Sequence, residues 1–306
     1  MCCLFGMIDY GGAFTGRQRT KALSILAAEC ESRGTDAAGI AYNSNGGLHI
    51  YKRPGPVHKL RLRIPNDAQV IMGHTRMTTQ GSERKNYNNH PFPGQAGGVR
   101  FALAHNGVLH NDQILRRSLP PTKIETDSYV AVQLIERQKT LDFISLKYVA
   151  EQVKGSFVFT LLDEHNNWYL VKGDNPMCLC HFPESKLYLY ASTEEILGRA
   201  LRKMRLGMEK PQRIKTKCGD LLKINRNGAI LRNAFALDDF YYPFFLRATH
   251  PKLNCSASKS TSEAEYLAQL KAVASCLGYS PDCVEEALRR GYTAEDIEEW
   301  LYCGQL

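Results

Sequence analysis

Met1-Cys2-Cys3-Leu4-Phe5-Gly6 opens the chain, and the interpretation of the remaining residues depends on this stretch. Removal of Met1 would leave Cys2 with a thiol and a free α-amine in one residue, and a small side chain at position 2 favours that removal. A thiol attacks as its thiolate, and an α-amine with a pKa of about 7.7–8.0 can serve as the adjacent base. The alternative is a structural cysteine packed into the core, as free cysteines often are.

Composition and length indicate an ordinary globular protein. The 306 residues are 43% hydrophobic and 23% charged, and they suffice for one large domain or a large domain plus a small one. No apolar run reaches the roughly 18 residues of a transmembrane helix, and no basic region followed by an apolar one marks a signal peptide. We therefore expect a cytoplasmic protein that does not act at a membrane.

Cysteine spacing and charge limit the classes of ligand. The ten cysteines form no C-x-x-C pair and no Cys/His ligand spacing, which argues against structural zinc and a disulfide framework. We expect reduced thiols, no metal and no cofactor. The net charge of +8 comes from basic residues that are spread out without interleaved aromatics. A solvated basic surface is therefore expected instead of a nucleic-acid site, although the basic segment 201–206 could face an acidic partner.

Hydrophobic periodicity divides the first part of the chain into strands and one helix. A strand is predicted over 4–10, and apolar residues at helical spacing predict a helix over 18–31. Residues 43–47 predict a turn between two strands. A buried strand over 69–74 leads into the polar segment 75–81, which suits a functional loop or a plain surface turn.

Two later segments also place polar residues directly after or before regular elements. The strand predicted over 99–105 runs into Asn106-Gly107, a dipeptide typical of tight hairpin turns. Thr126 or Asp127 would cap a helix that continues through Tyr129, and capping alone would account for Asp127. Further strands are predicted over 156–162, 168–172, 187–191 and 220–224. The pattern is α+β, with strand-rich runs at both ends and helices between them.

Seven short motifs occur in an order that is familiar. They are Cys2, Arg33-Gly34, Asp36, Gly73-His74-Thr75-Arg76, Asn88 to Pro91, His105-Asn106-Gly107 and Glu125-Thr126-Asp127. In this order they resemble the class II glutamine amidotransferases. These are the N-terminal-nucleophile hydrolases found as the glutaminase domains of glucosamine-6-phosphate synthase and amidophosphoribosyltransferase. The resemblance covers roughly residues 2 to 225 and implies a four-layer αββα sandwich.

The resemblance implies a catalytic set of three residues. Cys2 would attack the carboxamide carbon of L-glutamine, with its own α-amine moving the proton. The side-chain NH2 of Asn106 and the backbone N–H of Gly107 would donate to the tetrahedral oxyanion, and such a donor is worth roughly 10²–10³ in rate. A glycine suits this place because a backbone without Cβ can approach a ligand closely.

The resemblance also implies a substrate-binding set. Arg76 would hold the substrate α-carboxylate in a planar, charge-assisted pair, and Asp127 would accept hydrogen bonds from the α-ammonium. Thr79 and His90 fall at or near family positions that line the glutamine pocket. Arg33 would support catalysis by orienting the N-terminal amine.

Three residues depart from the family pattern. Cys3 follows the nucleophile where the family usually has Gly, so the backbone there must accommodate a side chain. Met77 and Gln80 stand where relatives of the synthase kind carry Trp and His. The loop over the pocket is therefore expected to close differently.

The remaining residues predict a separate C-terminal part. We assign residues 2–237 to the glutaminase domain and 238–261 to an aromatic strap and linker. Residues 262–306 are assigned to a three-helix module that resembles ubiquitin-associated domains. A short repeat supports this module, because residues 278–288 and 291–301 each have Gly-Tyr, a Ser or Thr helix cap and an acidic first turn. A helical cap on the main domain is the alternative to a protein-binding module.

About eighty residues follow the glutaminase pattern, too few for a synthase or phosphoribosyltransferase domain. The leading hypothesis is a stand-alone glutaminase that passes ammonia to an acceptor synthase in trans. A second hypothesis is a non-catalytic glutamine-binding or scaffold protein. A third, an amidase for another amide, is disfavoured because Arg76 with Asp127 suits an amino-acid substrate.

Overall fold

The computed structural model describes residues 2–204 and 210–236, together with 267, 270, 271, 274, 279, 280, 282–292 and 297. The chain divides into two compact units, Met1–Phe245 and Leu246–Leu306. The predicted strap and linker, most of the helix expected from residue 262, most of the second repeat copy and the end of the basic segment 201–206 lie outside the described residues. Within the described part, no helix has the length and apolar character needed to cross a membrane.

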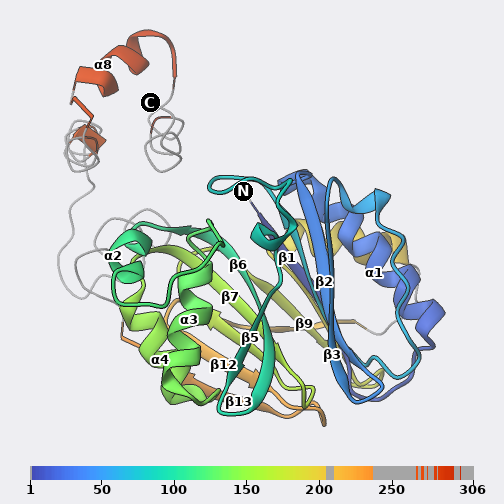
Figure 1. Cartoon of the computed structure of the whole chain (residues 1–306). Helices are drawn as coiled ribbons and strands as arrows, with labels where there is room; N and C mark the ends of the chain where they lie inside the picture. Colours follow the sequence, from blue (N-terminus) through green and yellow to red (C-terminus); the bar gives the residue numbers. More distant parts are fainter. Residues whose placement is uncertain are drawn as a thin grey trace, which may run out of the picture. The chain divides into compact units, whose positions relative to one another are not determined.

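Two antiparallel sheets form the first unit (Figure 1). One sheet has the strand order β11-β9-β10-β1-β4-β2-β3, and the other has the order β13-β12-β8-β7-β6-β5. Strands of the first sheet are β1 Cys3–Asp9, β2 Ala37–Ser44, β3 Gly47–Pro54, β4 Val70–Arg76, β9 Cys178–Phe182, β10 Leu187–Ala191 and β11 Gln212–Ile214. Strands of the second sheet are β5 Phe92–Ala96, β6 Val99–Leu109, β7 Gly155–Asp163, β8 Trp168–Lys172, β12 Asp220–Ile224 and β13 Ile230–Ala234.

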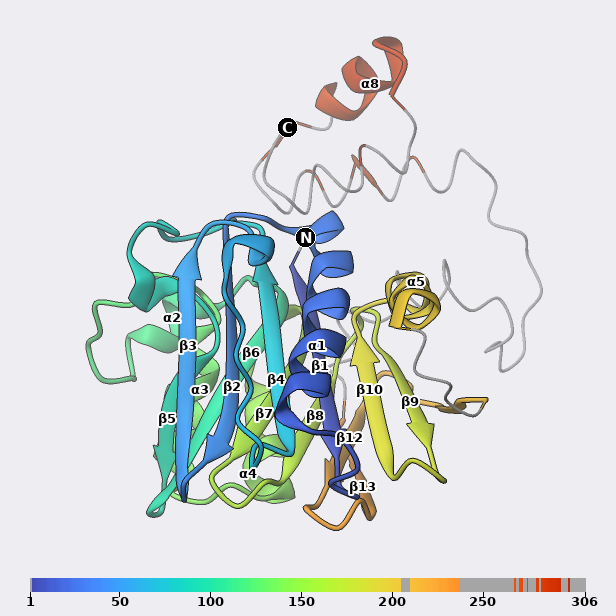
Figure 2. The same ribbon diagram turned by 90° about the vertical axis from the view of Figure 1, so that its right-hand side faces the viewer.

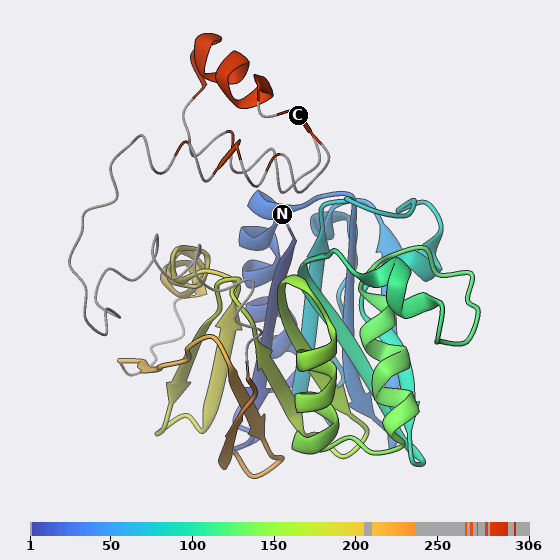
Figure 3. The same ribbon diagram turned by 90° about the vertical axis from the view of Figure 1, so that its left-hand side faces the viewer.

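Helices cover the outer face of each sheet. The first sheet carries α1 (Gly16–Cys30) and α5 (Glu194–Met204), as Figure 2 shows. The second sheet carries α3 (Tyr129–Gln138) and α4 (Phe143–Gln152), which Figure 3 shows from the opposite side. The short helix α2 (Asp112–Arg116) and the 3-10 turns η1 (Glu31–Arg33), η2 (Val57–Lys59) and η3 (Asn86–Asn88) lie in connections. The arrangement is the predicted αββα sandwich.

Strand alternation explains how one strand serves two cores. In β1, Cys3 and Phe5 pack in the core under α1 and α5, whereas Leu4 and Ile8 pack in the core between the two sheets. Successive side chains of a strand point to opposite faces. By this alternation, Cys2 is expected to face the same side as Leu4, which is the side between the two sheets.

Two expectations for regular elements are wrong. Asn106-Gly107 does not form a hairpin turn, because β6 continues through Leu109 and pairs Gly107 with Phe157. Gly107 has φ +141°, and a Cβ there would lie 1.9 Å from the Ser156 carbonyl oxygen, so only glycine fits. The N-cap of α3 is Ser128, and its side chain makes no capping hydrogen bond; neither Thr126 nor Asp127 caps the helix.

The second unit is described only in part. Helix α8 (Asp282–Arg289) lies in the first copy of the repeat and buries Val284 and Ala287. The Ser280 hydroxyl accepts a hydrogen bond from the Asp282 amide at 3.3 Å, which agrees with a helix start at this serine. The assignment of this unit to a three-helix module stays a prediction.

Candidate active site

The two adjacent cysteines have different surroundings. The Cys3 side chain is 0% exposed and packs with Cys30 in the core beneath α1. Burial and the neighbouring Cys3 raise the pKa of the Cys30 thiol well above its ordinary value. Cys2 is half-buried, and its Sγ lies 3.5 Å from the Met77 carbonyl oxygen. Cys3 therefore has a structural place, and Cys2 is the thiol that faces the candidate site.

Arg33 and Gly34 lie next to the backbone of the candidate site. Arg33 Nε donates to the Cys2 carbonyl oxygen at 3.0 Å, so the predicted supporting residue contacts the backbone of the predicted nucleophile. A Cβ on Gly34 would lie 2.5 Å from the Arg76 carbonyl carbon and 2.6 Å from the Met77 amide nitrogen. Gly34 thus lets η1 approach the end of β4.

The Cys2 thiol responds to its burial and to two charged neighbours. Burial raises its pKa above the ordinary value; the positive charge of Arg76 lowers this pKa, and the negative charge of Asp127 raises it. The thiol therefore lies within electrostatic reach of both predicted substrate-binding residues. Cys2, Arg76 and Asp127 come from three separate segments, and the fold brings them to one place.

Arg76 ends β4 with a buried guanidinium group. Nη1 donates to Asn89 Oδ1 at 2.6 Å, and Nη2 donates to the carbonyl oxygens of Gln80 and Gly81 at 2.6 and 2.9 Å. Burial lowers the pKa of Arg76, but an arginine stays charged in proteins. These contacts use three of its five N–H donors, which fix the plane of the guanidinium and leave donors for an anion.

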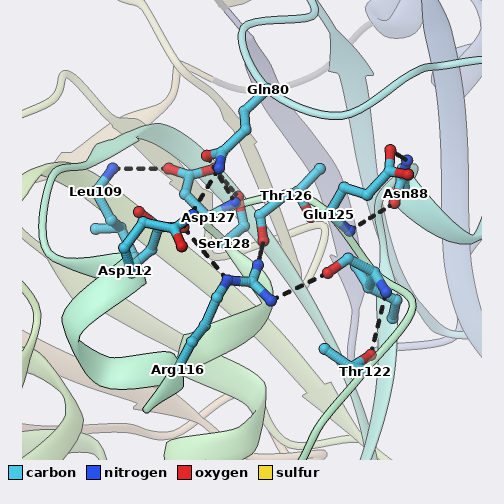
Figure 4. Close-up of polar contacts among 12 residues, drawn as sticks. Gln80, Asn88, Leu109, Asp112, Arg116, Thr122, Glu125, Thr126, Asp127 and Ser128 are labelled. Carbon is cyan, nitrogen blue, oxygen red and sulfur yellow. Dashed lines mark hydrogen bonds and ion pairs between the residues drawn. The ribbon is translucent and has the colours of Figure 1, made fainter.

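The Asp127 carboxylate is directed toward the end of β6 (Figure 4). Oδ2 accepts from the Leu109 amide at 2.7 Å, and Oδ1 accepts from the Ser128 hydroxyl at 3.3 Å. Its own backbone amide donates to Gln80 Oε1 at 3.2 Å. The carboxylate therefore does not cap α3. It binds the strand β6 at Leu109, two residues after Gly107.

Asn106 presents an unused donor. Its side chain is 1% exposed, and Nδ2 has no hydrogen-bond partner among the described residues. The Asn106 carbonyl oxygen is held by Asn175 Nδ2 at 3.1 Å, and the same Nδ2 reaches Ser156 Oγ at 2.5 Å. The backbone at Asn106 is thus fixed, while its amide group is left for a ligand.

The two predicted pocket residues differ in their surroundings. His90 is buried, packs against His74 in a tilted arrangement with ring centroids 4.2 Å apart, and meets Phe92 edge-on at 4.4 Å. Burial, and then the neighbouring charges, lower its pKa well below the ordinary value, so the ring is neutral. Thr79 is exposed, and the structure records no side-chain contact between it and the other candidate residues. The pocket-lining roles of both stay predictions.

Several supporting residues were not expected from the sequence. Arg116 of α2 donates to the carbonyl oxygens of Ile124 and Thr126 at 3.1 and 2.6 Å and to Asp112 Oδ2 at 3.3 Å (Figure 4). Gln80 Nε2 donates to the same Asp112 oxygen at 3.3 Å. Helix α2 has only five residues, so no periodicity pointed to it. Its acid–base pair at spacing i, i+4 was the one available signal.

The motif residues Asn88 and Glu125 have a structural role. The Glu125 amide donates to Asn88 Oδ1 at 2.9 Å, and Asn88 Nδ2 returns a bond to Glu125 Oε2 at 2.8 Å. This reciprocal pair joins the segment before β5 to the segment before α3. Among the described residues, no group of three or more His, Cys, Asp or Glu side chains is placed to hold a metal ion.

Sequence comparison identifies relatives for this part of the chain, although no protein-family model matches it. The isomerizing glutamine–fructose-6-phosphate aminotransferase of Geobacillus kaustophilus is 32% identical over 188 residues, which are 58% of this chain and 30% of the relative. The enzyme of the same name from Chlamydia muridarum is 33% identical over 208 residues, or 64% of this chain and 31% of the relative. The chain is a homologue of the class II glutamine amidotransferases.

Solved structures place this amidotransferase homologue in the same fold. Glutamine phosphoribosylpyrophosphate amidotransferase from B. subtilis, complexed with ADP and GMP, matches with a TM-score of 0.60 at 20% identity. A structure of the allosteric regulatory enzyme of purine biosynthesis matches with a TM-score of 0.61. Each match covers 78% of this chain and 50% of the other. The N-terminal-nucleophile hydrolase fold is confirmed, and the chain spans about 30% of the length of its curated relatives.

Proposed function

We propose that this amidotransferase homologue hydrolyses L-glutamine to L-glutamate and ammonia with Cys2 as nucleophile. The observation that carries the proposal is the buried Asn106 amide with an unpartnered Nδ2, next to Gly107 and its positive φ. A buried donor without a partner costs about 1–3 kcal/mol. Such a donor is well suited to an oxyanion that forms only during the reaction.

The reaction needs one nucleophile and one base, and Cys2 supplies both after Met1 is removed. Sγ attacks the carboxamide carbon of glutamine while the thiol proton moves to the α-amine. The oxyanion accepts hydrogen bonds from Asn106 Nδ2 and the Gly107 amide. Its collapse breaks the C–N bond, and the α-amine returns the proton to the leaving ammonia. Water then attacks the thioester, the C–S bond breaks, and glutamate and the thiol are released.

Substrate recognition follows from the two charges near the thiol. Arg76 binds the substrate α-carboxylate through the N–H donors that its contacts within the protein do not use. Asp127 accepts hydrogen bonds from the α-ammonium. Thr79 and His90 line the pocket for the aliphatic part. Arg33 positions Cys2 through the carbonyl oxygen that it holds at 3.0 Å.

The destination of the ammonia is a further part of the proposal. The curated relatives are named as fructose-6-phosphate aminotransferases, and this chain matches about 30% of their length. We assign ammonia transfer to a separate acceptor synthase in the cytoplasm, and we assign residues 262–306 to contact with a protein partner.

The test is intact mass together with glutamate release from L-glutamine. The variants are Cys2→Ala and, as a matched control one residue away, Cys3→Ala, because Cys3 lies in the core beneath α1. We expect loss of Met1, glutamate release by the wild type and the Cys3→Ala variant, and none by Cys2→Ala. A retained Met1, or glutamine binding without turnover, would overturn the catalytic proposal in favour of a glutamine-binding protein.

A further inference from the structure

The Gln80 side chain connects the loop after β4 to the opposite wall of the site. Its Nε2 donates to Asp112 Oδ2 at 3.3 Å, and its Oε1 accepts from the Asp127 amide at 3.2 Å (Figure 4). Both ends of one amide group are therefore used, on two different segments. Glutamine can do this because its amide carries a donor and an acceptor together.

The same loop also contacts the nucleophile and the arginine. The Met77 carbonyl oxygen lies 3.5 Å from Cys2 Sγ, and the carbonyl oxygens of Gln80 and Gly81 accept from Arg76 Nη2 at 2.6 and 2.9 Å. A shift of this backbone would move the atoms that orient both groups. The loop is thus part of the site through its carbonyl oxygens.

Besides these carbonyl contacts, two side chains, those of Asp36 and Gln80, hold the loop. In its first half, the Thr78 amide donates to Asp36 Oδ2 at 2.7 Å. In its second half, the Gln80 side chain makes the two contacts given above. The acceptor Asp112 is itself held by Arg116 Nε at 3.3 Å, and it is buried. Gln80 therefore attaches to a rigid partner.

We propose that Gln80 is a positioning residue for glutamine hydrolysis: its amide holds the loop 77–81 against Asp112 and the Asp127 backbone, so that Arg76 and Cys2 keep the geometry that glutamine needs. This inference rests on the proposed function. It does not require Gln80 to touch the substrate. It assigns a role to a residue that otherwise counts only as a departure from the pattern of the synthases.

The chemistry of the contact defines the informative substitutions. Gln80→Ala removes both hydrogen bonds. Gln80→Glu keeps an acceptor for the Asp127 amide but replaces the donor with a carboxylate that faces Asp112, and like charges at this distance repel. The matched control is Gln113→Ala: Gln113 Nε2 also donates to Asp112 Oδ2, at 3.2 Å, but it lies outside the loop, in α2.

The experiment measures steady-state glutamate release and, separately, amide hydrogen exchange of the ligand-free protein. We expect Gln80→Ala to lower kcat/KM for glutamine roughly 10- to 100-fold, as for the loss of two hydrogen bonds, and Gln80→Glu to lower it as well, through the lost donor and the repulsion from Asp112. Most of the change is expected in KM, because Arg76 loses its support. Amide hydrogen exchange should become faster in residues 77–81. It should stay unchanged in β7, where only a general loss of stability would make exchange faster. Gln113→Ala should resemble the wild type in both measurements.

Two results would overturn the inference. One is a Gln80→Ala variant with wild-type kinetics, and the other is exchange in residues 77–81 equal to that of the wild type. Absence of turnover in the wild type itself would count against the proposed function only. The exchange measurement needs no substrate, so it would still decide whether Gln80 holds the loop.

Discussion

At the scale of single residues, the structure distinguishes two adjacent cysteines that the sequence alone does not. Cys2 and Cys3 are chemically alike, and the alternation of β1 gives one of them to the site and the other to the core. Ordered motifs predicted site roles for Cys2, Arg33, Arg76, Asn106 and Asp127. They could not show that Gln80 bridges two segments, because that contact depends on how the loop folds.

The charges beside Cys2 lead to a prediction about its reactivity. Asp127→Asn removes the negative charge that raises the thiol pKa, so more thiolate is present at pH 8 and alkylation by iodoacetamide should be several-fold faster. Arg76→Gln removes the positive charge that lowers this pKa, so alkylation should be slower. Tandem mass spectrometry, with fragment ions that separate Cys2 from Cys3, measures the rate at Cys2.

The reagent and the neighbouring thiol provide the controls for this measurement. Iodoacetamide is uncharged, so the charge of the site does not attract or repel it. Within the same peptide, Cys3 should stay unmodified in the native protein, because its thiol is buried. If both substitutions changed the Cys2 rate in the same direction, the electrostatic account of the thiol would be wrong.

At the scale of elements, prediction worked where the local pattern was strong. Helix α1 and strands β7, β8, β10 and β12 match their predicted ranges to within two residues. Strand β5, Phe92–Ala96, was not expected, since Pro93 and Gly94 weaken any strand signal. Its place at the edge of the second sheet explains why a proline is tolerated there. Neither sheet order nor edge position can be read from such a segment alone.

Three buried histidines lie where β4 of one sheet meets β6 of the other. His74 Nε2 donates to the His105 carbonyl oxygen at 2.9 Å, and the His90 ring packs against His74 in a tilted arrangement. Burial lowers the pKa of His74 to about 3 and lowers the pKa values of His90 and His105 as well. The folded protein therefore keeps these rings neutral in mildly acidic solution, in which the unfolded chain protonates them.

The free energy of unfolding should therefore fall as the pH drops below 6.5, the ordinary histidine value. His74, whose pKa burial lowers to about 3, contributes roughly 1 kcal/mol per pH unit between pH 6 and 5. Urea denaturation at pH 7, 6 and 5 measures this dependence. His90→Gln should reduce the slope, because burial also lowers the pKa of His90 well below its ordinary value. An equal slope in the His90→Gln protein would contradict this explanation.

At the scale of the whole molecule, the family resemblance predicted the sandwich, and periodicity alone gave only its α+β class. The site draws on the start of β1, the ends of β4 and β6, and the segment before α3, which are far apart in sequence. Local patterns cannot place such segments side by side. Only the order of the motifs, as a family signature, made the constellation predictable.

All candidate site residues belong to the first of the two compact units. We therefore expect a protein ending at residue 245 to release glutamate with a kcat/KM within about twofold of the full chain. Circular dichroism melting should first show that the shortened protein is folded. Loss of activity in a folded shortened protein would assign residues 246–306 a part in the glutaminase reaction and would contradict the proposed domain division.

The continuation of β6 through Asn106-Gly107 affects how the protein ages. Asn-Gly is the dipeptide most prone to spontaneous deamidation, in which the glycine nitrogen closes a ring onto the asparagine side chain. That ring closure needs a mobile backbone, and here both residues are paired with β7. Deamidation would replace the amide donor with a carboxylate, at the place where the proposed oxyanion forms. The strand that shapes this site thus also protects it from slow chemical decay.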